Sequence, residues 1–95
     1  MPVEIVWSPL ARTRLREIRA YVGRDKPDAA ARLATRIVAV VEALREHPYL
    51  GRVGAKPEIR ELVIGGTPYS VLYGVQGKQV TIATIWHGAQ RRESK

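Results

Sequence analysis

Basic and aromatic side chains recur in the C-terminal half of the sequence, where they could together act on a phosphodiester. Arginine can stabilise the negative charge that develops on phosphate oxygens, and histidine or tyrosine can move a proton. Arg60 favours such a role because the interior of a strand is a costly place for a cation. The candidates are Arg52, Lys56, Arg60, Tyr69, Tyr73, Trp86, His87, Arg91 and Arg92.

Each candidate also has a purely structural interpretation. Tyr69 and Tyr73 are spaced for core or cross-strand packing, and His87 could simply end a strand. The basic side chains could form an ordinary solvated surface. A functional interpretation therefore requires a fold that brings several of these residues together.

Other kinds of reactive site find little support in the sequence. Cysteine is absent, so disulfides and thiolate metal sites are excluded. The pair Gly65-Gly66 has no Lys after it and does not predict a phosphate-binding loop. His47 and His87 lack the spacing of metal ligands. We expect neither a metal nor another cofactor.

The N-terminal half predicts one strand and two helices. Val3–Trp7 alternates loosely between apolar and polar residues, as a strand does. Ser8 is a good N-cap for a helix that runs from Pro9 to about Val22, with Gly23 closing it. A second apolar stripe covers residues 28–46. Two amphipathic helices with a short turn between them predict an antiparallel helical hairpin.

The C-terminal half predicts a three-stranded antiparallel meander. A loop rich in Pro and Gly covers residues 48–58, and tight turns separate the strands that follow. The predicted strands are Ile59–Ile64, Tyr69–Val75 and Val80–His87. The chain is thus expected to be a single α+β domain over residues 1–95, in which the sheet could gather the candidate residues.

Composition indicates a soluble, strongly basic protein with an aliphatic core. Sixteen Lys and Arg against nine Asp and Glu give a net charge of +7. Such a field attracts nucleic acids and acidic proteins. No signal peptide or membrane-spanning stretch is recognisable, so we expect a cytoplasmic protein without membrane contact.

Taken along its whole length, the sequence resembles the RelE/ParE family of toxins from bacterial type II toxin–antitoxin modules. The resemblance rests on WSPLARTRLREIRAYV, on RLATRIVAVVEALREHPYLGR, and on the run from PEIRELVIGGTPYSVLYGV to VTIATIWHGAQRR. Its most specific parts are GR followed by RELVIGGTPYSVLY, and the terminal WHGAQ. The order of elements expected above is also the order in that family's fold.

The resemblance implies one of two targets. ParE-like members inhibit DNA gyrase and so block replication, whereas RelE-like members cleave mRNA on the ribosome. RELVIGGTPYSVLY and WHGAQRR resemble the ParE-like branch, and lysine is sparse, with only Lys56 near the candidate residues. A gyrase inhibitor needs no catalytic residue. In the ribonuclease alternative, Arg60 and His87 match positions that some members use.

The preferred interpretation is therefore a ParE-like toxin, neutralised by an acidic, ParD-like antitoxin in a hetero-oligomeric complex. A basic nucleic-acid-binding domain is the second alternative, since it explains the charge but not the resemblance. The expected target-binding surface comprises Arg52, Lys56, Arg60, Tyr73, Trp86, His87, Arg91 and Arg92.

Overall fold

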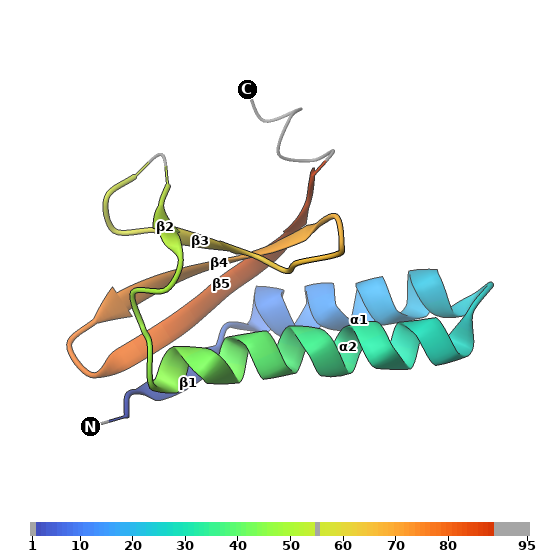
Figure 1. Ribbon diagram of the computed structural model, residues 1–95, viewed down its shortest axis with the longest axis horizontal. Helices are drawn as coiled ribbons and strands as arrows, with labels where there is room; N and C mark the ends of the chain where they lie inside the picture. Colours follow the sequence, from blue (N-terminus) through green and yellow to red (C-terminus); the bar gives the residue numbers. More distant parts are fainter. Residues whose placement is uncertain (1, 55, 89–95) are drawn as a thin grey trace.

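A computed structural model describes residues 2–54 and 56–88 of the chain. A five-stranded sheet in the order β1-β5-β4-β3-β2 carries both helices on one of its faces (Figure 1). β1 pairs in parallel with β5, and the other neighbours are antiparallel. In chain order the elements are β1 (Glu4–Trp7), α1 (Pro9–Gly23), α2 (Pro27–Glu42), the 3-10 turn η1 (Ala43–Arg45), β2 (Arg52–Val53), β3 (Arg60–Val63), β4 (Tyr69–Gln76) and β5 (Gln79–His87).

The predicted start of α1 is confirmed, and it also fixes the sheet. The side-chain oxygen of Ser8 accepts a hydrogen bond from the backbone N–H of Ala11 and donates one to the carbonyl of Ala83. Ala83 is the extra residue of a bulge in β5, because Leu72 pairs with Thr84 while Tyr73 pairs with Ile82. One hydroxyl therefore caps the helix and satisfies the carbonyl at the bulge.

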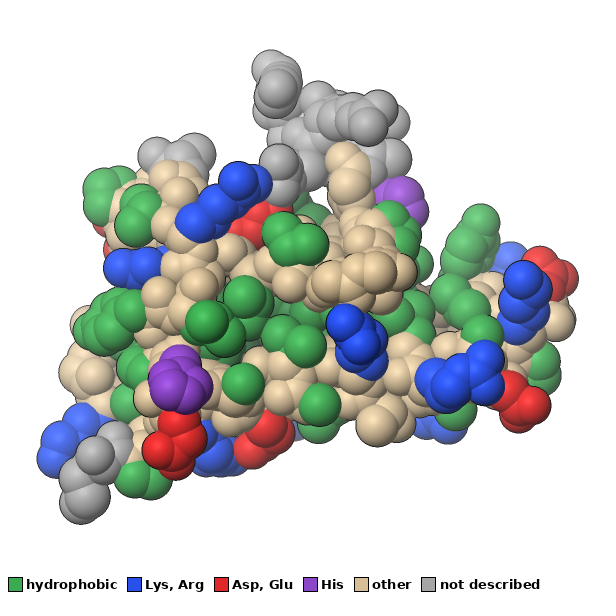
Figure 2. Space-filling model, viewed as in Figure 1, with side chains coloured by type: hydrophobic (Ala, Val, Ile, Leu, Met, Phe, Trp, Pro, Cys, Tyr) green, Lys and Arg blue, Asp and Glu red, His purple; other side chains and the backbone are tan. Residues whose placement is uncertain are grey.

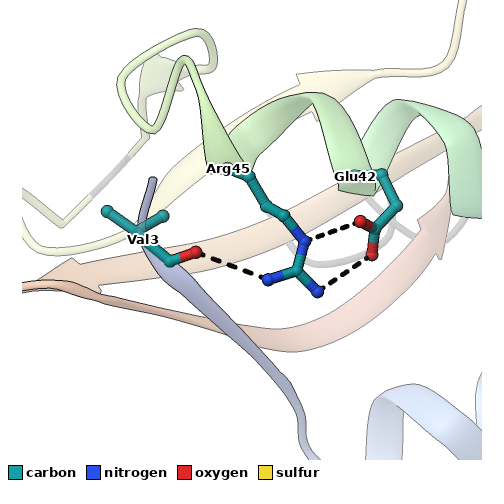
Figure 3. A network of polar contacts seen from close by, with 3 residues as sticks. All are labelled: Val3, Glu42 and Arg45. Atoms are coloured by element: carbon teal, nitrogen blue, oxygen red, sulfur yellow. Dashed lines mark hydrogen bonds and ion pairs between the residues drawn. The ribbon is translucent and has the colours of Figure 1, made fainter. Parts of the chain in front are cut away.

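The second helix ends earlier than the apolar stripe predicts. The α-helix stops at Glu42, and the chain tightens into a 3-10 turn through Arg45. This turn buries Leu44 completely and leaves the Arg45 carbonyl to accept from Val3 N–H at 3.1 Å. The guanidinium of Arg45 binds the carboxylate of Glu42, with 2.6 Å between Nε and Oε1, and reaches the Val3 carbonyl (Figure 3). Arg45 thus ties the start of β1 to the end of the helical hairpin.

The core lies between the helical hairpin and the sheet and is mainly aliphatic, as the composition predicts. Its fully buried members include Ile37, Val41, Leu44, Ile82 and Tyr73. Tyr69 is also buried, so the structural interpretation of both tyrosines is confirmed. Within the described part of the chain, no helix combines the length and apolar character needed to cross a membrane.

The expectation that residues 48–58 form a loop throughout is wrong at one point. Arg52 and Val53 form the short strand β2, paired with Glu61 and Arg60. A two-residue strand is too short to show alternation, and the surrounding Pro and Gly residues hide it. The meander itself is confirmed, and its two tight turns have glycines with positive φ, Gly66 at 79° and Gly77 at 60°.

Candidate functional site

The guanidinium of Arg60 binds the loop that leads into β2. Its Nη1 donates to the carbonyl of Gly51 at 2.8 Å and to that of Tyr49 at 3.4 Å. The guanidinium carbon also lies 4.9 Å from the centre of the Tyr49 ring. These three contacts with one loop offset the cost of placing a cation in the interior of a strand. Arg60 therefore holds the Tyr49–Gly51 segment against the sheet.

Tyr73, opposite Arg60 on β4, holds the same segment from inside the core. Its fully buried hydroxyl accepts a hydrogen bond of 2.7 Å from the backbone N–H of Gly51. Burial raises the pKa of Tyr73, and the Gly51 hydrogen bond and the charge of Arg60 oppose that rise only in part. The hydroxyl is consequently protonated near neutral pH and serves as a structural acceptor.

Gly51 is the residue of this cluster that sequence reasoning missed. A Cβ atom at this position would lie 2.8 Å from Cε1 and from the hydroxyl of Tyr73, and 2.9 Å from the Glu61 carbonyl. No side chain fits there without movement of the backbone. The only signal in the sequence was the Gly-Arg pair at positions 51 and 52, which carried part of the family resemblance but no assigned role.

Arg52 and Lys56 do not join Arg60. Arg52 forms an ion pair with Glu61, 3.4 Å between Nη2 and Oε1, in which the carboxylate is largely buried and the cation largely exposed. Glu61 follows Arg60 in the strand, so this pair lies on the opposite face of the sheet. The side chain of Lys56 is exposed in the loop before β3.

His87 lies at the other end of the sheet, paired with Tyr69. The two rings meet edge to face at a centroid distance of 5.3 Å. Burial raises the pKa of Tyr69, with a smaller contribution from Tyr21. These rings border an open recess of about 390 Å³, lined by Arg14, Glu17, Ile18, Tyr21, Tyr69, Ile85 and His87. Trp86 is the next residue back along β5 and is partly buried opposite Ser70.

The expectation that the sheet gathers the candidates into one site is not met for its two most reactive members. Arg60 pairs with Tyr73, and His87 pairs with Tyr69. Tyr69 and Tyr73 are four residues apart on β4, which is about 13 Å at roughly 3.3 Å per residue. Arg60 and His87 therefore cannot act on one phosphate in this arrangement. Arg91 and Arg92 lie outside the described residues.

A second feature lies at the β1 edge of the sheet. An open groove of about 550 Å³ runs beside β1 and is lined by Ile5, Val6, Trp7, Arg12, Leu15, Arg16 and Val38. The N–H groups of Glu4 and Ser8 point to β5, since they donate to the carbonyls of Lys78 and Ile82. Alternation along a strand directs the backbone groups of Ile5 and Trp7 to the open edge. The groove thus combines apolar walls, two arginines and a strand edge.

The fold is closely similar to that of a solved structure from a toxin–antitoxin system. The chain superimposes on a solved structure described as the chromosomal ParDE toxin–antitoxin system from P. aeruginosa with a TM-score of 0.83. The match has 25% sequence identity and covers 90% of this chain and 95% of the other. The toxin–antitoxin complex RelBE2 from Mycobacterium tuberculosis shares the fold, with a TM-score of 0.69 at 19% identity over 92% of this chain and 99% of that one. The architecture is that of the RelE/ParE superfamily.

Comparison of the sequence with known proteins narrows the assignment from the superfamily to one family. The model of the family described as the ParE toxin of the type II toxin–antitoxin system parDE matches residues 5–92. The chain therefore belongs to the ParE toxin family, as the resemblance implied. Protein Y4kP of Sinorhizobium fredii is 44% identical over 92% of this chain and 90% of its own length. Toxin RelE2 of Caulobacter vibrioides is 38% identical over 92% of this chain and 97% of its own.

Proposed function

We propose that this toxin inhibits DNA gyrase and thereby blocks replication. The observation that carries the proposal is the separation of Arg60 from His87, together with the engagement of Arg60 by two backbone carbonyls. Ribonuclease chemistry needs a cation and a proton-transfer group at one phosphate. A protein that acts by binding its target has no such requirement. Gyrase acts in the cytoplasm, so we infer that location for the toxin.

Cleavage of mRNA on the ribosome is the alternative, and the names of relatives keep it open. A protein named toxin RelE2 is among the similar sequences, and His87 borders an open recess. In that case His87 would need a cation other than Arg60 beside it. Arg14 lines the same recess, although it is paired with Glu17 at 3.2 Å.

We further infer an acidic antitoxin that binds the groove beside β1. Apolar side chains of a disordered segment would enter between Trp7 and Val38, its carboxylates would meet Arg12 and Arg16, and its backbone could extend the sheet at the open edge. The similarity to solved ParDE and RelBE2 toxin–antitoxin assemblies supports a partner of this kind.

One pair of assays on one preparation of the toxin tests the choice of target. Supercoiling by purified gyrase and mRNA cleavage on purified ribosomes are measured side by side. Inhibition of supercoiling without cleavage is the expected result. Cleavage with normal supercoiling would replace the gyrase proposal by the ribonuclease alternative.

A matched pair of variants tests the antitoxin groove. Val38→Asp places a charge in the groove, where Val38 is 40% exposed, whereas Val63→Asp changes a similarly exposed side chain on β3, outside the groove. We expect Val38→Asp to remain toxic but to escape neutralisation by the product of the neighbouring reading frame. Equal neutralisation of both variants would contradict the assignment of the groove.

The basic tail supplies a further test of target binding. Deletion of residues 89–95 removes Arg91, Arg92 and Lys95. We expect weaker inhibition, because surface cations speed the encounter with an acidic target. Unchanged inhibition at low ionic strength would remove the tail from the target-binding surface.

A further inference from the structure

Helix α1 carries a row of exposed arginines on the side that borders the groove. Arg12, Arg16 and Arg19 follow one another at intervals of four and three residues, so they lie within about 60° of one another around the helix axis. Arg24, at the C-cap, lies about 80° from Arg16 around the axis and lines the same recess as Arg16 and Arg19. Arg12 and Arg24 are separated by twelve residues, or about 18 Å along the axis.

None of these four arginines has a carboxylate partner within residues 2–54 and 56–88. The ion pairs of that part of the chain use Arg14, Arg45 and Arg52 instead. Arg16 makes a long hydrogen bond of 3.4 Å to Thr13, and the guanidinium of Arg24 lies 5.8 Å from the centre of the Tyr21 ring. Arg24 also suits the C-terminal end of a helix. The other three are like charges at a spacing that destabilises a helix.

The residues that surround the arginine row differ between its two halves. Arg12 and Arg16 border the apolar groove beside β1. Beyond Arg16, the described residues that line a shallow recess are Arg16, Arg19, Ala20, Gly23 and Arg24. Lys and Arg side chains also recur on the face of the helical hairpin seen in Figure 2. The outer half of the row thus offers charge and small residues but no large apolar side chain.

We propose that the outer half of this row binds the phosphate backbone of duplex DNA. The planar fork of arginine suits phosphate oxygens, and the roughly 12 Å of helix from Arg16 to Arg24 spans about three phosphates of one strand at roughly 3.4 Å each. α1 packs against β5 and α2, so it can lie along a duplex only by its exposed side. Such contacts position a protein on DNA without reading the sequence.

An acidic peptide fits the recess less well than DNA does. A disordered peptide must offset the entropy lost on ordering, and it does so mainly by burying apolar anchors. The recess from Arg16 to Arg24 has no large apolar side chain among its described lining residues to hold such anchors. The phosphate backbone of DNA needs no apolar anchors, because the release of condensed counterions drives its binding. This inference does not depend on whether gyrase is the toxin's target.

The test compares two double variants with the same change in charge. Arg19→Gln with Arg24→Gln removes the outer half of the row, and Arg32→Gln with Arg36→Gln removes two exposed arginines from α2. Binding of the full-length chain to a labelled duplex of arbitrary sequence is followed by fluorescence anisotropy between about 50 and 200 mM salt. Circular dichroism and thermal melting verify that both variants fold.

We expect the α1 variant to reduce the slope of log affinity against log salt by about 1.8, at about 0.9 per phosphate contact. The α2 variant should bind within about twofold of the unmodified chain, because it leaves those contacts intact. Equal weakening of both variants would reduce the effect to net charge and overturn the proposal. So would an absence of binding by the unmodified chain, or equal competition by polyglutamate at matched charge.

Discussion

Tyr69, at the start of β4, and Tyr73, in its middle, are held in different ways. The buried hydroxyl of Tyr73 accepts a hydrogen bond from the Gly51 N–H, and the Arg60 guanidinium donates one to the Gly51 carbonyl. The ring of Tyr69 meets His87 edge to face beside an open recess. Two tyrosines that look equivalent in the sequence therefore differ in what depends on them. Tyr73 fixes a loop, and Tyr69 borders an open recess.

The largest expected loss of stability follows substitution of Gly51. Gly51→Ala places a methyl group 2.8 Å from Tyr73 and 2.9 Å from the Glu61 carbonyl. We expect the free energy of unfolding to fall by about 3 kcal/mol, as in other overpacked cores. Gly65→Ala is the control, since its Cβ would meet only the end of the Arg36 side chain at 3.5 Å. Similar denaturation midpoints for the two variants would show that the Gly51 contact can relax.

Tyr73→Phe should have the next largest effect. It leaves the buried N–H of Gly51 without its acceptor, at an expected loss of about 2 kcal/mol in denaturant unfolding. Tyr21→Phe changes an exposed tyrosine and should be nearly silent. A loss equal to that of Tyr21→Phe would mean that another acceptor replaces the hydroxyl.

The same tyrosine should make stability sensitive to alkaline pH. Because the folded pKa of Tyr73 is raised above its unfolded value near 10, its contribution is complete below about pH 10 and is lost as the pH rises further. The decline should be at most about 1.4 kcal/mol per pH unit for this group, and shallower in Tyr73→Phe. Tyr69 contributes in the same direction. Parallel curves for the two proteins would contradict the assignment to Tyr73.

Arg60→Ala should cost less, about 1.5 kcal/mol, because its partners are carbonyls rather than a buried carboxylate. Arg60→Lys should recover part of this loss, since an ammonium can donate to one carbonyl but cannot cover the Tyr49 ring as a planar guanidinium does. Thermal melting and toxicity are measured together. Loss of toxicity with an unchanged melting temperature would assign Arg60 a direct contact with the target.

The smallest effect is expected for His87→Gln. The variant loses the ring contact with Tyr69, so the free energy of unfolding should fall by about 0.5–1 kcal/mol, and gyrase inhibition should change only mildly. If His87 acted as an acid or base in a ribonuclease, this variant would instead lose about 10²- to 10⁴-fold in cleavage rate. That second result would make the surroundings of Tyr69 and His87 catalytic and so overturn the contrast between Tyr69 and Tyr73.

Local patterns predicted most of the fold. Ser8-Pro9, the two apolar stripes and the glycine turns identified the helices and the meander, because each is a signal within a few residues. The parallel pairing of β1 with β5 was not predicted, since nothing near Val6 indicates a partner as distant as Thr81. The bulge at Ala83 was not predicted for the same reason, because the hydroxyl that binds its carbonyl comes from the distant Ser8.

The candidate site was less predictable than the fold. Residue types identified Arg60 and His87 as chemically capable, but register decides whether they meet, and the register separates them along β4. The role of Arg60 depends on the carbonyls of Tyr49 and Gly51, which carry no signal in a sequence of side chains. Gly51 was overlooked for a related reason, since its importance lies in the space that it leaves to Tyr73.

The pairing of β1 with β5 has a consequence for when the sheet can form during translation. Glu4 lies beside Gln79, and the Ser8 hydroxyl binds a carbonyl 75 residues further along the chain. During translation, the helical hairpin can form while β1 still has no neighbour, because β5 is synthesised after every other described element. The groove beside β1 is finished only when that strand arrives. An antitoxin that recognises this groove would therefore meet its binding surface only after β5 has left the ribosome.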